Sequence, residues 1–493
     1  MPRIPHLTLG TLCTLLLTLS SCKEASTTSS QNQQLQQLIQ ELSLDGDPID
    51  GRLIPEITEP MSQLGRDLFF TKGLGGNQTA ACASCHHPVL GGGDALALPI
   101  GVDALDPELC GEGRVHDPSA EHYDGGPTVP RNSPTTFNLA LWSETLFWDG
   151  RVQEVAGGIA TPDSATATTP DPLAGSNLSE AQARFPVTSP EEMRGFTFEP
   201  GESNTTVRDH LAGRLGNFGA GAGELSEDWL GQFRLVFNDP IAPADEVITF
   251  ERVVEAIAAY ENSQVFVDTP WSDYVQGDAT ALSESARRGA LLFFQEAGQG
   301  GFSCFKCHGG DFFTDEKFYV VGFPQIGRGK GDVNHLGGAT ADFGRERVTG
   351  DAKDRFAFRT PSLINVAVTA PYGHAGSFLT LEETMRYHLD PFAGFATYTG
   401  AGVQPGMQLD DLLVNTQEVL DVLQAQQAQG NSLLPANLAF SEKNITDLVA
   451  FLHALTDPRV LSPAAMEPWI PRSGGIFEDS QRLDGYTATS TDL

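Results

Sequence analysis

One short cysteine motif occurs twice, and it constrains this chain more than any other feature. Each copy has the spacing Cys-x-x-Cys-His and follows an apolar segment that ends in two phenylalanines, residues 64–70 in one case and 288–294 in the other. The chain therefore carries an internal duplication at the scale of a domain. The two motifs consist of Cys82, Cys85 and His86, and of Cys304, Cys307 and His308.

This spacing is typical of covalent haem attachment. Two thiols three residues apart on one helical turn can bond the two vinyl groups of a haem, and the following histidine can bind the iron from one face. A zinc knuckle would need four ligands where each motif clusters three, and a thiol redox pair is the other alternative. The duplication, together with the N-terminal pattern described next, favours haem. We therefore predict two covalently bound haem c groups, one for each motif.

The N-terminus has the pattern of an export signal. Arg3 precedes an apolar run over residues 7–19, which is too short to span a bilayer, and the sequence Ser20-Ser21-Cys22 follows it. We predict a signal peptide over 1–21 and a lipid anchor on Cys22, and the alternative is a cleaved signal with an incidental cysteine. Residues 22–50 are predicted to be a flexible tether. These features indicate the periplasm, with membrane contact only through the lipid.

The rest of the chain is predicted to be mainly α, as two cytochrome c-like haem domains with long loops and insertions. The N-terminal domain is expected over 51–245, the C-terminal domain over 246–470, and a polar tail over 471–493. Phe250, Val253, Val254, Ile257 and Ala258 recur at helical spacing and predict one apolar helix face. A second helix is expected over 445–455. Residues 100–130 and 157–230 are rich in Gly, Pro, Asp, Ser and Thr and are predicted to be loops.

The charge balance limits the class of partner. The chain has 30 Lys and Arg against 64 Asp and Glu, a formal net charge of −34. Such a surface repels nucleic acid and anionic membranes, so we expect no nucleic-acid partner. It favours a basic redox partner.

Several further motifs carry a family resemblance. Between about residues 60 and 457, the chain resembles the bacterial di-haem cytochrome c peroxidase family, which includes the MauG-like enzymes that oxidise a protein partner. Besides the two cysteine motifs, the resemblance rests on segments 64–70, 131–135, 147–151, 190–193, 312–315, 359–363 and 369–376.

The resemblance implies a division of labour between the haems. The N-terminal haem would react with hydrogen peroxide, and the C-terminal haem would accept electrons from a small donor protein such as a cytochrome c or a cupredoxin. Trp148 matches the aromatic residue between the haems, and Glu192 matches the acid of the peroxide pocket, which would move a proton between the peroxide oxygens. Asn132, Thr369 and Pro371 match the residues whose oxygens hold a calcium ion between the domains.

The N-terminal half departs from the family pattern in two ways. Val102 stands where some members have a histidine that caps the resting haem, which predicts an open iron, although His116 or His122 could replace that cap. The glutamine that follows the 147–151 motif in the family is predicted to be absent, because the sequence Gly157-Gly158 occupies the neighbourhood and Gln153 is out of register.

The C-terminal half departs at the sixth iron ligand. The family uses Met or, in the MauG-like branch, Tyr, whereas this register falls on His388, with Met385 as the runner-up. We predict a peroxidase, and the alternatives are a MauG-like oxidase of a specific protein partner, a non-catalytic electron carrier, and a relative that keeps its haems only for folding. The resemblance leaves the oligomeric state open, with a homodimer among the options.

Overall fold

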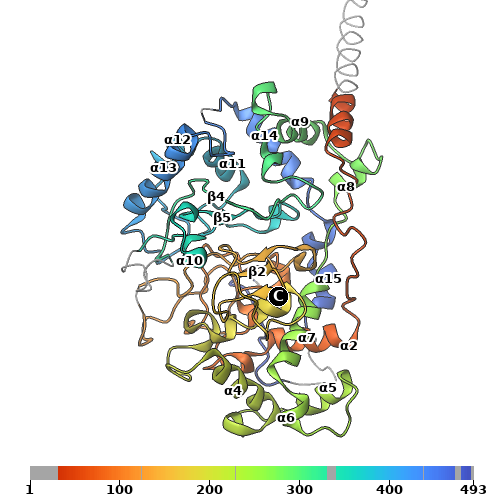
Figure 1. Ribbon diagram of the computed structural model, residues 1–493, viewed down its shortest axis with the longest axis vertical. Coiled ribbons are helices and arrows are strands. Elements are labelled where there is room, and N and C mark those ends of the chain that lie inside the picture. The colour runs from red at the N-terminus through yellow and green to blue at the C-terminus, as the bar shows by residue number, and fades with distance from the viewer. Residues whose placement is uncertain are drawn as a thin grey trace, which may run out of the picture.

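The computed structural model describes residues 31–123, 125–227, 229–329, 340–436, 438–471 and 479–489. The chain is mainly helical with long connections, and its short strands lie between two groups of helices (Figure 1). The helices are α2 Pro60–Phe70, α3 Leu178–Ala183, α4 Asn204–Gly216, α5 Trp229–Val236, α6 Ala244–Val247, α7 Phe250–Asn262, α8 Pro270–Val275, α9 Glu284–Phe294, α10 Glu346–Thr349, α11 Leu381–Leu389, α12 Pro391–Phe395, α13 Leu412–Ala428, α14 Glu442–His453 and α15 Pro463–Met466. The strands are β1 Thr145–Leu146, β2 Val152–Val155 and β3 Gly158–Ala160 in one antiparallel sheet, and β4 Phe318–Tyr319 and β5 Phe358–Arg359 in another.

The duplication seen in the sequence is present in the packing of two helix pairs. Helix α2 crosses α7, and α9 crosses α14, with a glycine at each crossing point. A Cβ atom on Gly65 would lie 1.8 Å from the carbonyl oxygen of Ala256, and one on Gly289 would lie 1.9 Å from that of Asp447. Only glycine allows the two backbones to approach so closely. Residue 256 faces the glycine of its partner helix in one crossing, and residue 447 does so in the other. These two positions are therefore equivalent, and α7 can be aligned with α14 position by position from them.

The ends of these helices are fixed by local sequence. Helix α2 begins with Pro60, whose ring suits the first helical turn. The Ser283 hydroxyl accepts a hydrogen bond from the backbone N–H of Ala286 at the start of α9, and Ser441 and Asn444 form a capping box at the start of α14. Helix α7 buries the apolar face that the sequence predicts, and α14 covers most of the helix predicted over 445–455.

The packing of α7 corrects the predicted boundary between the domains. Its apolar side chains lie in one core with those of α2, whereas α9 and α14 form a second core. Helix α7 therefore closes the first unit, as α14 closes the second, and a boundary at residue 246 is too early. The predicted boundary was misplaced because an amphipathic helix does not specify which neighbour will cover its apolar face.

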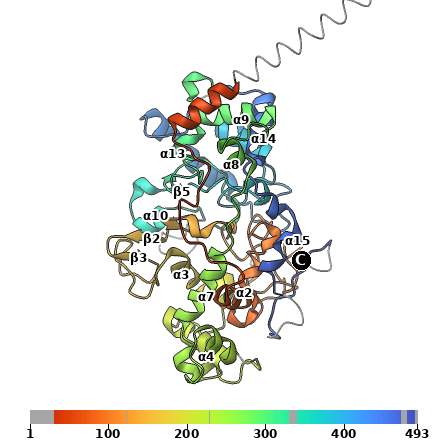
Figure 2. The same ribbon diagram turned by 90° about the vertical axis from the view of Figure 1, so that its right-hand side faces the viewer.

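Both ends of the described chain cross to the other unit. Residues 31–41, predicted to be part of a flexible tether, are helical and bury Leu35 and Ile39 in the core of α9 and α14. This helix lies at the α9 end of the molecule in both views, although the chain then continues to α2 in the other half (Figures 1 and 2). In the predicted polar tail, Leu483 is 2 % exposed and packs in the core of α2. The predicted signal peptide and the lipid anchor on Cys22 lie outside the described residues.

Part of the region predicted to be loop is helical. Residues 157–230 contain α3 and α4, and α4 buries Val207, Leu211 and Leu215. These three residues recur every four positions, so the helical signal was present among the Gly, Ser and Thr residues that suggested a loop.

A buried ion pair joins the two halves beside the short sheets. Arg131 lies 2.5 Å from a carboxylate oxygen of Asp342 and 2.6 Å from one of Asp149, and all three side chains are at most 4 % exposed. Burial alone would raise the pKa of Asp342, but the charge of Arg131 and its hydrogen bonds outweigh burial and hold this pKa at about 2.

We expect Asp342→Asn to destabilise the protein by about 3 kcal/mol, because it leaves half of the Arg131 charge unpaired in the interior. Chemical denaturation followed by absorption measures this change. The Asp342 carboxylate contributes stability above its ordinary pKa of 3.8, and the wild type should lose that contribution as the pH falls toward 2. Asp351→Asn is the matched control, because Asp351 pairs with Lys353 on the surface and should matter little. Equal effects of the two variants would contradict the assignment.

Within the ranges described above, no helix combines the length and the apolar character needed to cross a bilayer.

Candidate functional site

The second cysteine motif opens onto a cavity of about 250 Å³ inside the C-terminal unit. Cys304, Cys307 and His308 line it from a short 3₁₀ turn that directly follows α9 and its loop. Its remaining wall is largely apolar. Helices α9, α11 and α14 contribute Phe293, Leu381, Leu448 and Leu452 to this wall, and the connecting segments contribute others, among them Phe323.

The hydrogen bonds of His308 orient its ring for metal binding. Its Nδ1 lies 3.2 Å from the carbonyl oxygen of Phe313 and 3.1 Å from that of Pro361, so Nδ1 carries the proton and donates it. The other nitrogen, Nε2, keeps its lone pair. Burial also lowers the pKa of His308, which favours the neutral form that can bind a metal.

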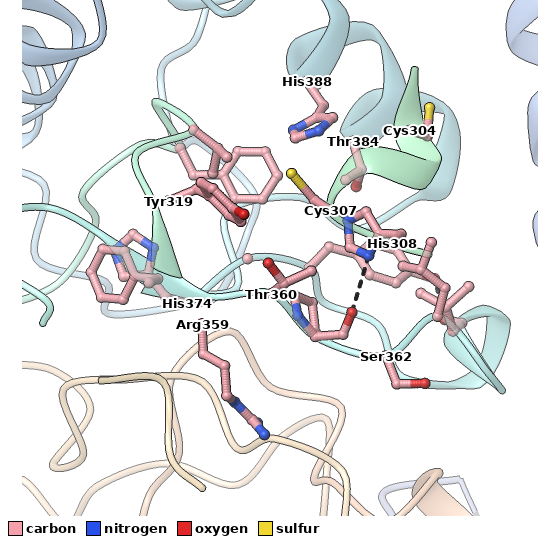
Figure 3. A pocket seen from close by; sticks show the side chains of 18 of the residues that line it. Cys304, Cys307, His308, Tyr319, Arg359, Thr360, Ser362, His374, Thr384 and His388 are labelled. Atoms are coloured by element: carbon pink, nitrogen blue, oxygen red, sulfur yellow. Dashed lines mark hydrogen bonds between the residues drawn. The ribbon is translucent and has the colours of Figure 1, made fainter. Parts of the chain in front are cut away.

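His388 lies in the same cavity as His308. It comes from α11, and Figure 3 shows its ring on one side of the Cys307 thiol and the ring of His308 on the other. Burial, and to a smaller extent the nearby His308, lowers the pKa of His388 to about 4, so this imidazole is neutral as well. Met385, one turn earlier on α11, also lines the cavity. Both predicted candidates for the sixth ligand therefore line the same cavity as the second cysteine motif.

The first cysteine motif opens onto a smaller cavity of about 120 Å³. Cys82, Cys85 and His86 line it, and Nδ1 of His86 lies 3.2 Å from the carbonyl oxygen of Gly92, which repeats the arrangement at His308. Glu192 also lines this cavity, from a short π-helical turn over Pro190–Arg194. The predicted acid and the predicted attachment motif therefore meet in one place.

A glutamine that the sequence analysis missed lines the same cavity. Gln182 lies on α3, within the sequence Leu178-Ser179-Glu180-Ala181-Gln182 that precedes the Glu192 turn. The prediction of an absent glutamine was wrong in this respect, because an insertion after residue 151 moves the equivalent segment about thirty residues from the 147–151 motif. Gln153 lies elsewhere and bonds the carbonyl oxygen of Ala167.

The predicted alternatives for a capping histidine lie outside the N-terminal cavity. His116 bonds the carbonyl oxygen of Gly126, and His122 stacks on Phe196 with ring centres 4.3 Å apart. Val102 is fully buried, and its N–H donates to the carbonyl oxygen of Glu191 at 3.2 Å. The segment that could carry a cap is therefore packed against the turn that carries Glu192.

Two tryptophans form part of the wall between the cavities. Trp148 and Trp142 each line both of them, and the Trp148 indole N–H donates to the carbonyl oxygen of Asn132 at 2.9 Å. The guanidinium of Arg359 lies 3.5 Å from the centre of the Trp142 ring. Sequence reasoning selected Trp148 by its motif but gave no signal for Trp142.

The two cavities fit haem better than a single metal ion. A zinc site needs four donors around one ion, whereas each cavity combines two thiols and one imidazole with a large apolar wall. Nε of Arg359 and Nε2 of His374 are buried in the wall of the larger cavity without a hydrogen-bond partner among the described residues. Such donors suit the carboxylates of haem propionates.

The residues predicted to hold calcium line one cavity, but they do not form a cluster of charged ligands. Asn132, Thr369 and Pro371 all line the larger cavity, and the Asn132 amide donates to the carbonyl oxygens of Leu96 and Ala97. No cluster of three or more His, Cys, Asp or Glu side chains suited to a metal ion occurs in the described part of the chain. A calcium site here would depend on amide and backbone oxygens.

Comparison with known proteins agrees with this geometry. The family model for di-haem cytochrome c peroxidase matches residues 59–280. The MauG protein of Methylorubrum extorquens is 27 % identical over 68 % of this chain and 69 % of its own, and cytochrome c551 peroxidase of Pseudomonas aeruginosa is 26 % identical over 67 % and 71 %.

Solved structures show the same fold. A MauG-like protein associated with microbial copper homeostasis is 24 % identical and has a TM-score of 0.52 over 85 % of this chain and 97 % of its own. The di-haem peroxidase BthA of Burkholderia thailandensis is 20 % identical, with a TM-score of 0.53 over 85 % and 91 %.

The fold and the two cavities are those expected of the class of c-type cytochromes with two covalent haems. Within that class, the resemblance to the di-haem cytochrome c peroxidase family, predicted from the motifs, is confirmed. The family implies two c-type haems for this chain.

Proposed function

We propose that this protein is a di-haem peroxidase that reduces hydrogen peroxide at its N-terminal haem, with electrons relayed through its C-terminal haem. The observation that carries the proposal is the smaller cavity, where Glu192 and Gln182 accompany His86 and the two thiols. Each half would form a cytochrome c-like domain, built around the α2–α7 pair and the α9–α14 pair respectively.

The side chains of the N-terminal cavity have separate roles. The haem, when bound, supplies an iron that exchanges electrons with peroxide. His86 would hold that iron through Nε2, because its Nδ1 is engaged by the carbonyl oxygen of Gly92. Glu192 would accept a proton from one peroxide oxygen and return it to the other, so that this second oxygen leaves as water. Converting the remaining oxygen to water takes two electrons, relayed through the C-terminal haem, and two protons from solvent. The Gln182 amide can donate a hydrogen bond to the substrate without exchanging a proton.

Trp148 is proposed to carry electrons between the haems, because its indole lines both cavities. We expect Trp148→Phe to slow electron transfer between the haems by about tenfold, which corresponds to about 1.4 kcal/mol on the barrier. Rapid mixing of the reduced protein with peroxide, followed at the absorption bands of both haems, measures this rate.

Trp142→Phe is the matched control. The Arg359 cation over the Trp142 ring stabilises the neutral indole and disfavours the loss of an electron from it. A larger effect at Trp142 than at Trp148 would reverse the proposed route.

A MauG-like oxidation of a specific protein is the second candidate. His388, rather than Met, in the C-terminal cavity and the buried Val102 in place of a capping histidine favour it. Assaying peroxide consumption with a reduced cytochrome c or cupredoxin, against oxidation of a protein encoded nearby, separates the two. A chain that ignores peroxide with both irons six-coordinate would instead be an electron carrier.

We also propose a periplasmic location with a lipid anchor at Cys22, and a calcium ion held by oxygens of Asn132, Thr369 and Pro371. Treatment with a chelator tests the ion. It should release about one calcium per chain and change the haem spectra, and unchanged spectra with no released calcium would exclude the site.

A further inference from the structure

The aligned helix pairs reveal one position where the two halves differ in chemistry. Because residue 256 superimposes on 447, Glu261 on α7 corresponds to Leu452 on α14. Both residues line the haem cavity of their own half. The N-terminal cavity therefore contains a carboxyl group where the C-terminal cavity has a hydrocarbon side chain.

Glu261 is buried, and no nearby charge or hydrogen-bond donor among the described residues stabilises its carboxylate form. Its side chain is 4 % exposed, and its Oε2 has no hydrogen-bond partner among the described residues. The ionisable groups that line the same cavity are His86, Arg131, Arg151, Glu192, Arg359 and the two cysteines, and Tyr260 precedes Glu261 on α7. Arg131 is already paired with two aspartates, and Arg359 is directed at Trp142.

A structural role alone does not explain this carboxyl. A leucine serves the equivalent position in the other half, and an unpaired carboxyl in an apolar site costs free energy that a leucine would not. Burial raises the pKa of Glu261 to about 8, so the group changes its protonation state close to neutral pH. A charge that appears nearby would shift this balance, because charges interact strongly across a poorly screened interior.

We propose that Glu261 is a charge-compensating acid of the N-terminal haem, and this inference rests on the haem assignment made above. When the iron held by His86 gains one electron, the Glu261 carboxylate takes up one proton from solvent, so the net charge of the cavity does not change. When the iron loses that electron, Glu261 releases the proton. Leu452 cannot do this, so the C-terminal haem lacks such a coupling.

The experiment is a redox titration of the full-length holoprotein between pH 6 and 9, followed at the absorption bands of each haem. In the wild type, the potential of the N-terminal haem should fall as the pH rises, by up to about 59 mV per pH unit for one proton per electron. The C-terminal haem, in the same sample, is the internal control and should show the weaker dependence.

Two variants test the assignment to Glu261. Glu261→Gln keeps the shape but cannot titrate, and Glu261→Leu copies the other half, so each should flatten the pH dependence of the N-terminal haem. Glu251→Gln makes the same chemical change at an exposed position of α7 and should leave it intact. A carboxyl band in the infrared difference spectrum between redox states should disappear in both Glu261 variants and persist in Glu251→Gln.

The possible outcomes distinguish failure of the role proposed for Glu261 from failure of the haem assignment. A pH-independent N-terminal potential in the wild type would overturn the inference without any variant, and so would an unchanged slope in Glu261→Gln with both haems in place. A purified protein without two covalent haems would instead contradict the proposed function itself.

Discussion

Replacing Glu192 by Gln is expected to lower kcat/KM for hydrogen peroxide by about 10²- to 10⁴-fold, the range typical of losing a general acid–base group. The carboxyl that lines the cavity with His86 is exchanged for an amide that cannot accept and return a proton. Steady-state assays with a reduced donor measure the loss. Haem content and the binding of cyanide to the N-terminal iron should stay as in the wild type.

Glu191→Gln is the matched control for that experiment. Glu191 is the preceding residue in the same turn, but its carboxylate accepts a hydrogen bond from the Ser189 hydroxyl at 2.9 Å and does not line the cavity. Its turnover should therefore be close to that of the wild type. Similar losses in both variants would indicate that the turn, and not the Glu192 carboxyl, limits the reaction.

Replacing His388 by Met is expected to raise the potential of the C-terminal haem, because a Met and His pair holds iron at a higher potential than two histidines. Axial ligands span roughly 0.8 V across proteins, so the shift should be easy to resolve by redox titration. His388→Ala should open the sixth position and let that iron bind cyanide. Delivery of electrons to the N-terminal haem should slow in both variants.

Met385→Leu distinguishes the two ligand candidates on α11. Both residues line the cavity, but only the loss of the true ligand changes the spectrum and the potential of that haem. A normal spectrum in His388→Ala together with an altered one in Met385→Leu would assign Met385 as the ligand.

The two Cys-x-x-Cys-His sites could be predicted because their residues are close together in the sequence. Two thiols and an imidazole within five residues are positioned by one turn of the chain, and no distant contact is needed to bring them together. The apolar face of α7 could be predicted for the same reason, since its spacing lies within a single helix.

The arrangement of the units depends on contacts between distant segments, and here sequence reasoning was less successful. The sequence of residues 31–41 does not show that Leu35 will pack against α9 and α14. The sequence of the C-terminal tail likewise does not show that Leu483 will pack against α2. Gln182 was missed because the insertion before α3 breaks the spacing on which its motif depends.

Glu261 shows a different limit. At the end of an amphipathic helix, a glutamate is usually a solvated residue. Its burial becomes apparent only in the structure, where α7 packs closely against α2 at Gly65. In this arrangement Glu261 lines the cavity. The comparison with Leu452 needs the structure of both halves.

Haem counting combined with electron paramagnetic resonance of the purified oxidised protein tests the central claim most directly. Two covalent haems per chain should survive extraction with acid acetone. One iron should be high-spin and reachable by peroxide or cyanide, and the other should be low-spin with two imidazole ligands. Haem that is extracted by the acid solvent, or two irons that both refuse external ligands, would contradict the account.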